Sequence, residues 1–166
     1  MRRMFLLVIT CVCALLPLAR AQVKTEPGKS PKAVLAAYIE AWNRRDYDAF
    51  DRLLASDGVH EDLAAGFRGQ GAAQVKEFMS EVLKEEPDFV WKVTNVIESG
   101  NTVVAEWNWT ATHTGDSPIG RVTGKHITGR GATVAVIKNG RIQRFTDYYD
   151  NASFFPKIPG GPPGGN

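Results

Sequence analysis

One turn signal near the C-terminus constrains the fold of this chain more than any other feature. Asn139-Gly140 separates two runs of strand-like alternation, residues 132–138 and 141–150. The Asn-Gly pair readily takes the positive φ angles of a type I′ turn, which joins adjacent antiparallel strands. The sequence therefore predicts a β-hairpin here, and with it an antiparallel sheet.

The second strand of this hairpin carries an acid between aromatic side chains. Because side chains alternate along a strand, Phe145, Asp147 and Tyr149 share one face. Burial among aromatic rings raises the pKa of a carboxyl group, which lets it accept and return protons near neutral pH. Asp147 is therefore the first candidate for acid/base chemistry. The alternative is an aspartate on the outer face of the sheet, exposed or paired with Arg144.

The first 21 residues have the pattern of a secretory signal peptide. Arg2 and Arg3 precede the apolar run 4–18, and residues 19–21 form a small-x-small cleavage site. The apolar run is short for a membrane span, which needs roughly 20 residues. We expect cleavage after Ala21, a secreted or periplasmic location, and no membrane attachment of the mature protein.

The remaining chain has the size of one domain. About 145 residues follow the predicted cleavage site, enough for a single hydrophobic core. Cys11 and Cys13 leave with the signal peptide, so we expect no disulfide. We assign residues 22–30 to a flexible lead-in, 31–155 to the domain and the Pro/Gly-rich stretch 156–166 to a disordered tail.

The charge of the mature chain argues against nucleic acid as a partner. The full chain has 20 Lys and Arg against 18 Asp and Glu. Without the three arginines of the leader, 17 basic residues face 18 acidic ones. The positive surface that attracts a phosphate backbone is therefore not expected.

Hydrophobic spacing predicts three helices, followed by strands. The first covers residues 31–43, with Ser30 as its N-cap. The second covers 47–54, with Asp46 as a cap and residues 56–58 as its end. The third covers 71–85 and ends before Pro87. The predicted strands are residues 59–67, 89–97, 102–113, 121–128, 132–138 and 141–150.

Helices followed by antiparallel strands indicate an α+β fold. Such a fold packs its helices on one face of a curved sheet. A strongly bent sheet wraps these helices into a cone, and the mouth of the cone can form a pocket.

The long strand 102–113 supplies candidate pocket residues. Trp107, Trp109 and His113 share one face, suited to a flat ligand, whereas Glu106 points the other way. The alternative is an aromatic core or a dimer face. We place His126 at the surface.

The sequence contains no pattern for a metal or another cofactor. The three histidines, His60, His113 and His126, have no metal-ligand spacing such as HExxH. There is also no nucleophile elbow, no phosphate-binding loop and no dinucleotide fingerprint. We therefore expect neither a metal nor another cofactor.

The order of elements and several short motifs resemble the nuclear-transport-factor-2-like superfamily, in particular its SnoaL-like polyketide cyclase and ketosteroid isomerase branches. The motifs span residues 38–46, 57–62, 100–104 with Trp107, 112–115, 139–142 and 147–150. The resemblance implies a cone of three helices on a curved antiparallel sheet. It also implies cofactor-free acid/base chemistry on carbonyl compounds, or a non-catalytic relative of that fold.

Each branch implies its own catalytic residues. The cyclase branch places its acid/base aspartate at Asp147 and a histidine on the preceding strand, where this chain has Thr133. The isomerase branch places its proton-shuttling aspartate at Asp62 and an enolate-stabilising tyrosine at Tyr38. Its second oxyanion donor has no counterpart here. The alternative for Asp62 and Tyr38 is a turn aspartate and a core tyrosine.

Together these observations predict an exported domain that cyclises or isomerises a small apolar carbonyl compound. The oxyanion donor would be Tyr38, Tyr148 or Tyr149. The predicted substrate-binding residues are Trp107, Trp109, His113, His60, Phe145 and Tyr149. The alternative is a non-catalytic domain that binds a small ligand or a partner. An open sheet face also predicts a homodimer.

Overall fold

The computed structural model describes residues 30–115 and 123–150 of the chain and gives an α+β fold, as the sequence predicts. Its elements are α1 (Pro31–Arg44), α2 (Ala49–Leu53), β1 (Leu54–Asp62), β2 (Phe67–Gln70), α3 (Gly71–Glu85), β3 (Val90–Ser99), β4 (Thr102–Thr112), β5 (His126–Lys138) and β6 (Arg141–Tyr149). The predicted signal peptide, lead-in and Pro/Gly-rich tail lie outside the described residues.

The helix α1 begins where the sequence indicates. The hydroxyl oxygen of Ser30 accepts a hydrogen bond from the backbone N–H of Ala33, and Pro31 occupies the first turn. The helix ends at Arg44, and its C-cap residue Arg45 has a left-handed φ of 59°. Its buried stripe includes Tyr38 and Trp42, which face the sheet and the site described below.

The helices α2 and α3 lie close to their predicted positions. The N-cap position of α2 is Asp48 rather than the predicted Asp46, but the side chain of Asp46 accepts a hydrogen bond from the backbone N–H of Ala49, the first residue of α2, at 3.1 Å. The helix α3 covers the predicted range and buries Val75 and Met79. Glu86, its C-cap residue, donates its backbone N–H to the carbonyl of Val82.

Six strands form one sheet in the order β2-β1-β6-β5-β4-β3. All neighbours are antiparallel except β1 and β6, which run parallel. The predicted hairpin joins β5 to β6, with φ angles of 53° at Asn139 and 70° at Gly140. The parallel pairing sets Asp62 opposite Asp147, so residues far apart in the sequence meet in the middle of the sheet.

Two strand predictions were wrong. Residues 121–128 and 132–138 were predicted as separate strands, but β5 runs without a break from His126 to Lys138. Its glycines, Gly129 and Gly131, make room for indole rings of β4 rather than ending a strand.

The prediction around β1 was also wrong. Residues 59–67 were predicted as one strand and 56–58 as the end of the second helix. Instead β1 already begins at Leu54 and contains 56–58 at an irregular step in its pairing with β6, while Phe67 starts β2. At this step Gly58 packs so closely on β6 that an added Cβ would lie 2.5 Å from the carbonyl of Ile142.

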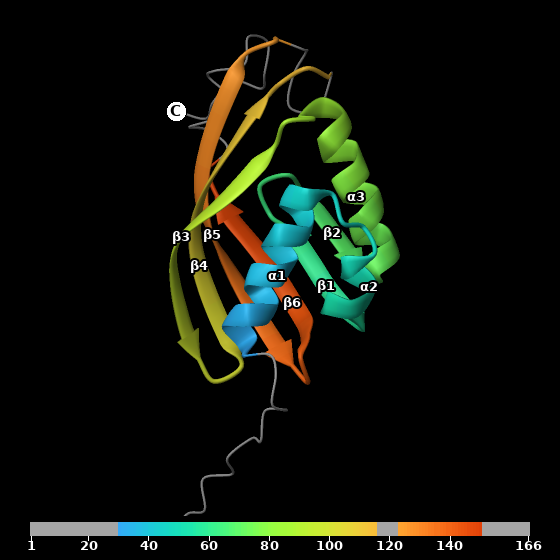
Figure 1. Cartoon of the computed structure of the whole chain (residues 1–166), viewed down its shortest axis with the longest axis vertical. Helices are drawn as coiled ribbons and strands as arrows, with labels where there is room; N and C mark the ends of the chain where they lie inside the picture. Colours follow the sequence, from blue (N-terminus) through green and yellow to red (C-terminus); the bar gives the residue numbers. More distant parts are fainter. Residues whose placement is uncertain (1–29, 116–122, 151–166) are drawn as a thin grey trace, which may run out of the picture.

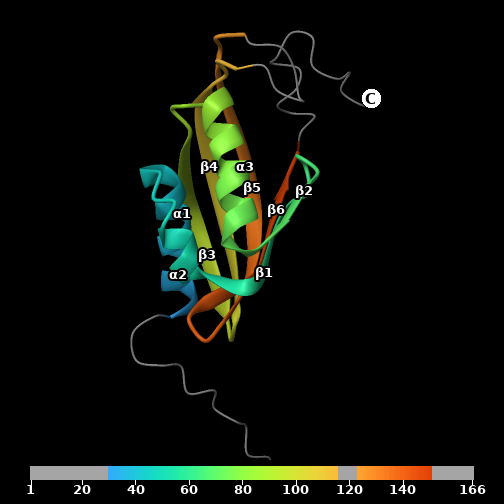
Figure 2. The ribbon, with the colours of Figure 1, turned by 90° about the vertical axis from the view of Figure 1, so that its right-hand side faces the viewer.

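The helices position a hydrophobic layer against the sheet. Figure 1 shows α1 lying across the sheet, where it contacts β3 to β6, and α3 on the side of β1 and β2. The turned view in Figure 2 shows the bend of the sheet and α3 running along it. No helix in the described part of the chain is long and apolar enough to cross a membrane.

Candidate active site

A pocket of about 380 Å³ opens between α3 and the sheet. Its polar lining residues from the sheet are His60 and Asp62 of β1 and Asp147 and Tyr149 of β6. The strands β3 and β4 contribute Trp91, Trp107 and Trp109, and α1 contributes Trp42. The remaining lining residues are Ala65, Gly66, Phe67, Phe78, Glu81, Val82, Glu85, Glu86 and Phe89.

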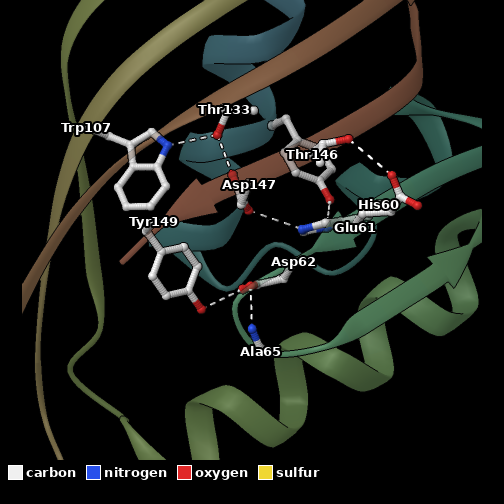
Figure 3. A network of polar contacts seen from close by, with 10 residues as sticks. His60, Glu61, Asp62, Ala65, Trp107, Thr133, Thr146, Asp147 and Tyr149 are labelled. Carbon is white, nitrogen blue, oxygen red and sulfur yellow. Dashed lines mark hydrogen bonds and ion pairs between the residues drawn. The ribbon is translucent and has the colours of Figure 1, made fainter. Parts of the chain in front are cut away.

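Asp147 is held on both of its carboxyl oxygens. Thr133, its direct neighbour on β5, donates its hydroxyl to Oδ1 of Asp147. The indole N–H of Trp107 donates to the oxygen of Thr133 at 2.8 Å. On the other side, Nε2 of His60 lies 3.4 Å from Oδ2 of Asp147. This chain of contacts crosses the strands β4, β5, β6 and β1 (Figure 3).

The contacts continue from His60 into the core. Nδ1 of His60 lies 2.8 Å from the hydroxyl of Tyr38 on α1. Both side chains are buried, and the ring of Phe145 packs against each of them. A buried imidazole with a partner on both nitrogens has a fixed orientation, which holds its Nε2 toward Asp147.

Asp62 forms a second polar cluster beside the first. Its Oδ2 accepts a hydrogen bond from the hydroxyl of Tyr149 at 3.0 Å, and its Oδ1 accepts from the backbone N–H of Ala65 at 2.9 Å. Figure 3 shows Tyr149 and Asp62 meeting below Asp147. The two clusters therefore share one pocket floor.

Burial dominates the acid/base properties of the floor. It raises the pKa of Asp147 above the ordinary aspartate value, against the opposing hydrogen bonds from His60 and Thr133. Burial also raises the pKa of Asp62, and it raises the pKa of Tyr149 and of Tyr38. The two tyrosines thus keep their protons and act as hydrogen-bond donors.

At the other end of the pocket, Glu86 follows the last turn of α3. Burial raises the pKa of Glu86 to about 7, and the negative charges of Glu85 and Asp88 add to this shift. Within residues 30–115 and 123–150, no group of three His, Cys, Asp or Glu is placed to hold a metal ion.

Comparison with known proteins identifies the family. The family model of the SnoaL-like polyketide cyclases matches residues 32–158. The chain belongs to the SnoaL-like polyketide cyclase family. A comparison with curated proteins found no match.

Solved structures share the fold of this SnoaL-like protein. IdmH, a putative polyketide cyclase from Streptomyces antibioticus, aligns with a TM-score of 0.68 and 19% identity, covering 78% of this chain and 98% of that one. A putative polyketide cyclase from Acidithiobacillus ferrooxidans gives 0.68 and 25%, covering 81% and 97%. A Catenulispora acidiphila protein with a ketosteroid isomerase-like fold, in complex with trimethylamine, gives 0.66 and 21%, covering 76% and 93%.

The structure brings together most of the predicted site residues. Six of them line the pocket, namely His60, Asp62, Trp107, Trp109, Asp147 and Tyr149. The sequence offered Asp147 on one side, and Asp62 with Tyr38 on the other, as alternative acid/base sets. The parallel pairing of β1 with β6 joins them in one site.

Three predicted residues do not line the pocket. Tyr38 lies behind His60 and contacts it through its hydroxyl, and Phe145 is a fully buried core ring. His113 lies beyond the end of β4 and is buried away from the cavity, with Thr123 as its Nδ1 neighbour at 3.5 Å. Alternation along the strand correctly predicts that His113 and Trp109 share one face of the sheet. It does not predict how far along the strand the pocket extends.

Sequence reasoning did not assign Trp42, Trp91 or Glu86 to the site. The spacing of Trp42 is typical of the buried stripe of a helix. Trp91 is one aromatic residue in a strand with an irregular register, and its spacing indicates no site. Glu86 follows the end of α3, where an acid is usually exposed. A cluster of three glutamates at 81, 85 and 86 was the only available signal, because like charges at the end of a helix are unfavourable.

Proposed function

We propose that this SnoaL-like protein cyclises or isomerises a small apolar carbonyl compound without a cofactor, with Asp147 as the general acid/base. One observation carries the proposal. Asp147 is only 3% exposed, yet it lines an aromatic pocket and is held by hydrogen-bonding partners on both oxygens. A carboxyl group in this setting is fixed in place and has a raised pKa, as proton transfer near neutral pH requires.

The hydrogen bonds determine which oxygen of Asp147 is available. The indole N–H of Trp107 can only donate, so the oxygen of Thr133 is its acceptor and the Thr133 hydrogen goes to Oδ1 of Asp147. Oδ1 is thus already engaged as an acceptor. A proton taken from a substrate goes to Oδ2, whose contact with His60 is long at 3.4 Å.

Tyr38 favours the ionised form of Asp147 before a substrate proton arrives. Because burial raises its pKa, Tyr38 keeps its proton and donates it to Nδ1 of His60. With Nδ1 as the acceptor, Nε2 of His60 carries a hydrogen that faces Oδ2 of Asp147. This tautomer stabilises the carboxylate, which is the form that removes a proton from a carbon acid.

Removal of a proton next to a carbonyl also requires a donor for the enolate oxygen. Of the three tyrosines considered, Tyr148 is 47% exposed and does not line the pocket, and Tyr38 is committed to His60. Tyr149 lines the pocket, but its hydroxyl hydrogen goes to Asp62. Trp91 also lines it, and its indole N–H has no hydrogen-bond partner among the described residues. We assign the donor role to Trp91.

Deuterium exchange into a panel of cyclic ketones tests the proposal. Wild type should speed exchange at the carbon next to the carbonyl, and Asp147→Asn should lower that rate at least about 100-fold, the usual contribution of a general base. Asp57→Asn is the matched control, because Asp57 is an exposed aspartate of β1 outside the pocket. Its rate should equal that of wild type.

Equal exchange rates for wild type and Asp147→Asn would discard the acid/base role. If ketones then still bind in the pocket, the protein is a non-catalytic binding domain, the alternative class for this fold. The threonine at the position of the cyclase histidine is the feature that favours this alternative.

Two further parts of the proposal concern export and assembly. We propose export after cleavage behind Ala21. Mass spectrometry of the exported protein tests this, and any N-terminus other than Gln22 contradicts it.

We also propose a homodimer through the open sheet face, where Ile97, Val104 and Val134 are cross-strand neighbours in an apolar row. Sedimentation velocity tests this, and a monomer at all concentrations contradicts it.

A further inference from the structure

Carboxyl groups carry the charge of the pocket lining. Five carboxyl side chains face the pocket, and none of its described lining residues is a lysine or an arginine. The carboxyl groups form two sets. Asp62 and Asp147 belong to the floor, whereas Glu81, Glu85 and Glu86 belong to the C-terminal end of α3. The second set has no part in the proposed acid/base step.

Glu86 is the informative member of the second set. It is only 8% exposed, and its carboxyl group has no hydrogen bond or ion pair among the described residues. The nearby guanidinium of Arg45 is engaged by the carbonyls of Asn43 and Pro87. An acid this deeply buried is normally paired. Its partner is therefore expected to come from outside the chain.

The end of α3 is an unfavourable place for acids. The C-terminus of a helix carries partial negative charge, so acidic side chains there are destabilising. Glu81 and Glu85 are also four residues apart, at a spacing where like charges repel. Lys84 is the basic residue of this turn, and it does not line the pocket. A cation beside Glu86 would offset the negative partial charge of this helix end.

The aromatic wall beside Glu86 is suited to the same charge. Phe89 stacks on Trp109 with ring centroids 5.8 Å apart, and it lies 6.1 Å from Trp91 and 6.2 Å from Trp42. Ring faces carry negative potential and attract organic cations, tryptophan most strongly. Carboxylates together with several aromatic rings form the type of site that holds alkylated ammonium groups.

We propose that the pocket binds ligands that carry an organic ammonium group, with Glu86 as the counter-ion and the rings of Trp42, Phe89, Trp91 and Trp109 around the alkyl groups. This inference rests on the proposed function, since it adds a positively charged nitrogen to the substrate class. The apolar body and carbonyl group of such a substrate would reach the floor at Asp147, while its ammonium group remains at the end of α3.

A matched pair of probes tests the inference by binding alone. Choline and 3,3-dimethylbutan-1-ol have nearly the same shape, but only choline is charged. All four tryptophans of the chain line the pocket, so tryptophan emission reports its occupancy. With the full chain, choline should bind at least about tenfold more tightly than the neutral alcohol, as expected for a desolvated cation against rings and an acid.

Two glutamate variants separate the site from general charge effects. Glu86→Gln keeps the shape and removes the charge, so choline affinity should fall about tenfold while that of the alcohol stays unchanged. Glu77→Gln makes the same charge change on an exposed residue of α3 outside the pocket and should leave both affinities unchanged.

Equal affinity of the two probes, no saturable choline binding, or unchanged choline affinity in Glu86→Gln would each overturn the inference. The exchange test of Asp147 uses neutral ketones and measures a rate. Failure of the ammonium site therefore leaves the acid/base role untouched, and failure of the acid/base role leaves the binding result standing.

Discussion

Thr133 links the aromatic wall to the acid of the site. Its hydroxyl oxygen accepts the Trp107 indole hydrogen and its own hydrogen goes to Asp147, so one small side chain satisfies two buried polar groups. Its hydrogen bond also lowers the pKa of Asp147 against the larger effect of burial. Under the proposed function, Thr133 is therefore a positioning residue that holds Asp147 and opposes the rise of its pKa.

Replacing this hydroxyl should affect both stability and pH dependence. Thr133→Val leaves the Trp107 N–H without a partner, which should lower the free energy of unfolding by about 2 kcal/mol. The exchange rate falls at low pH as Asp147 becomes protonated. In Thr133→Val this fall should occur at a higher pH, because the pKa of Asp147 rises further. Urea denaturation and pH–rate profiles measure the two effects.

Two threonine variants serve as controls for this prediction. Thr133→Ser keeps the hydroxyl and should keep the wild-type pH profile. Thr128→Val makes the same change at an exposed position of β5 and should alter neither property. An unchanged pH profile in Thr133→Val would show that Thr133 contributes packing alone.

At the scale of single residues, the sequence predicts which face of its strand Asp147 occupies, but not its polar partners. Alternation along one strand places Asp147 beside Phe145 and Tyr149, and this requires no tertiary information. The contact with His60 requires the parallel pairing of β1 and β6, which joins residues 87 positions apart. No local pattern in either segment encodes that pairing.

At the scale of elements, β5 is shaped to accommodate the tryptophans of β4. Gly129 lies opposite Trp109, and Gly131 lies opposite Trp107. A Cβ added at Gly131 would lie 2.5 Å from the Trp107 ring and 2.5 Å from the backbone oxygen of Tyr148. The bare backbone of β5 thus lets the indole rings lie close over the strand and form the pocket wall.

Alanine at the two glycines should have unequal effects. Gly131→Ala meets a backbone oxygen that cannot move without disturbing β6, whereas Gly129→Ala meets only the Trp109 ring, which borders the cavity. Gly131→Ala should therefore lower the free energy of unfolding by about 2 kcal/mol, and Gly129→Ala by less. Urea denaturation measures the difference, and near-ultraviolet circular dichroism follows the indole rings.

Equal destabilisation by the two alanines would mean that the backbone contact at Gly131 does not determine the loss of stability.

The same glycines explain why β5 was predicted as two strands. Glycine is usually unfavourable within a strand, so a sequence pattern treats it as a break. Only the partner strand shows that Gly129 and Gly131 are required by the rings of Trp107 and Trp109. By contrast, the Asn139-Gly140 hairpin is local and was predicted correctly.

At the scale of the whole molecule, the pocket makes folding sensitive to pH. Burial is the largest cause of the raised pKa of Asp62, Glu86 and Asp147. At a pH between the unfolded and the folded pKa of such a group, the folded protein therefore keeps a proton that the unfolded chain has released. Asp88 shifts in the opposite direction through its hydrogen bonds to Thr112, but it is ionised in both states above pH 5.

For Glu86, the direction in which pH changes the stability of the fold is set by its pKa. This pKa is 4.5 in an unperturbed chain and about 7 in the fold. The stability contributed by its bound proton is complete below pH 4.5 and is lost as the pH rises to about 7. Wild type should therefore be less stable at pH 8 than at pH 5, with Glu86 contributing on the order of 2 kcal/mol of the difference.

Urea denaturation of wild type and Glu86→Gln at pH 5 and pH 8 measures this contribution. The glutamine carries no proton to lose, so the variant should show a smaller decrease and exceed wild type in stability at pH 8. Glu77→Gln, exposed on the same helix, should follow wild type. An identical decrease in Glu86→Gln and wild type would mean that Glu86 is already ionised in the fold at pH 5. Choline should reduce the wild-type decrease, because a bound cation stabilises the ionised form of Glu86 that exists at pH 8.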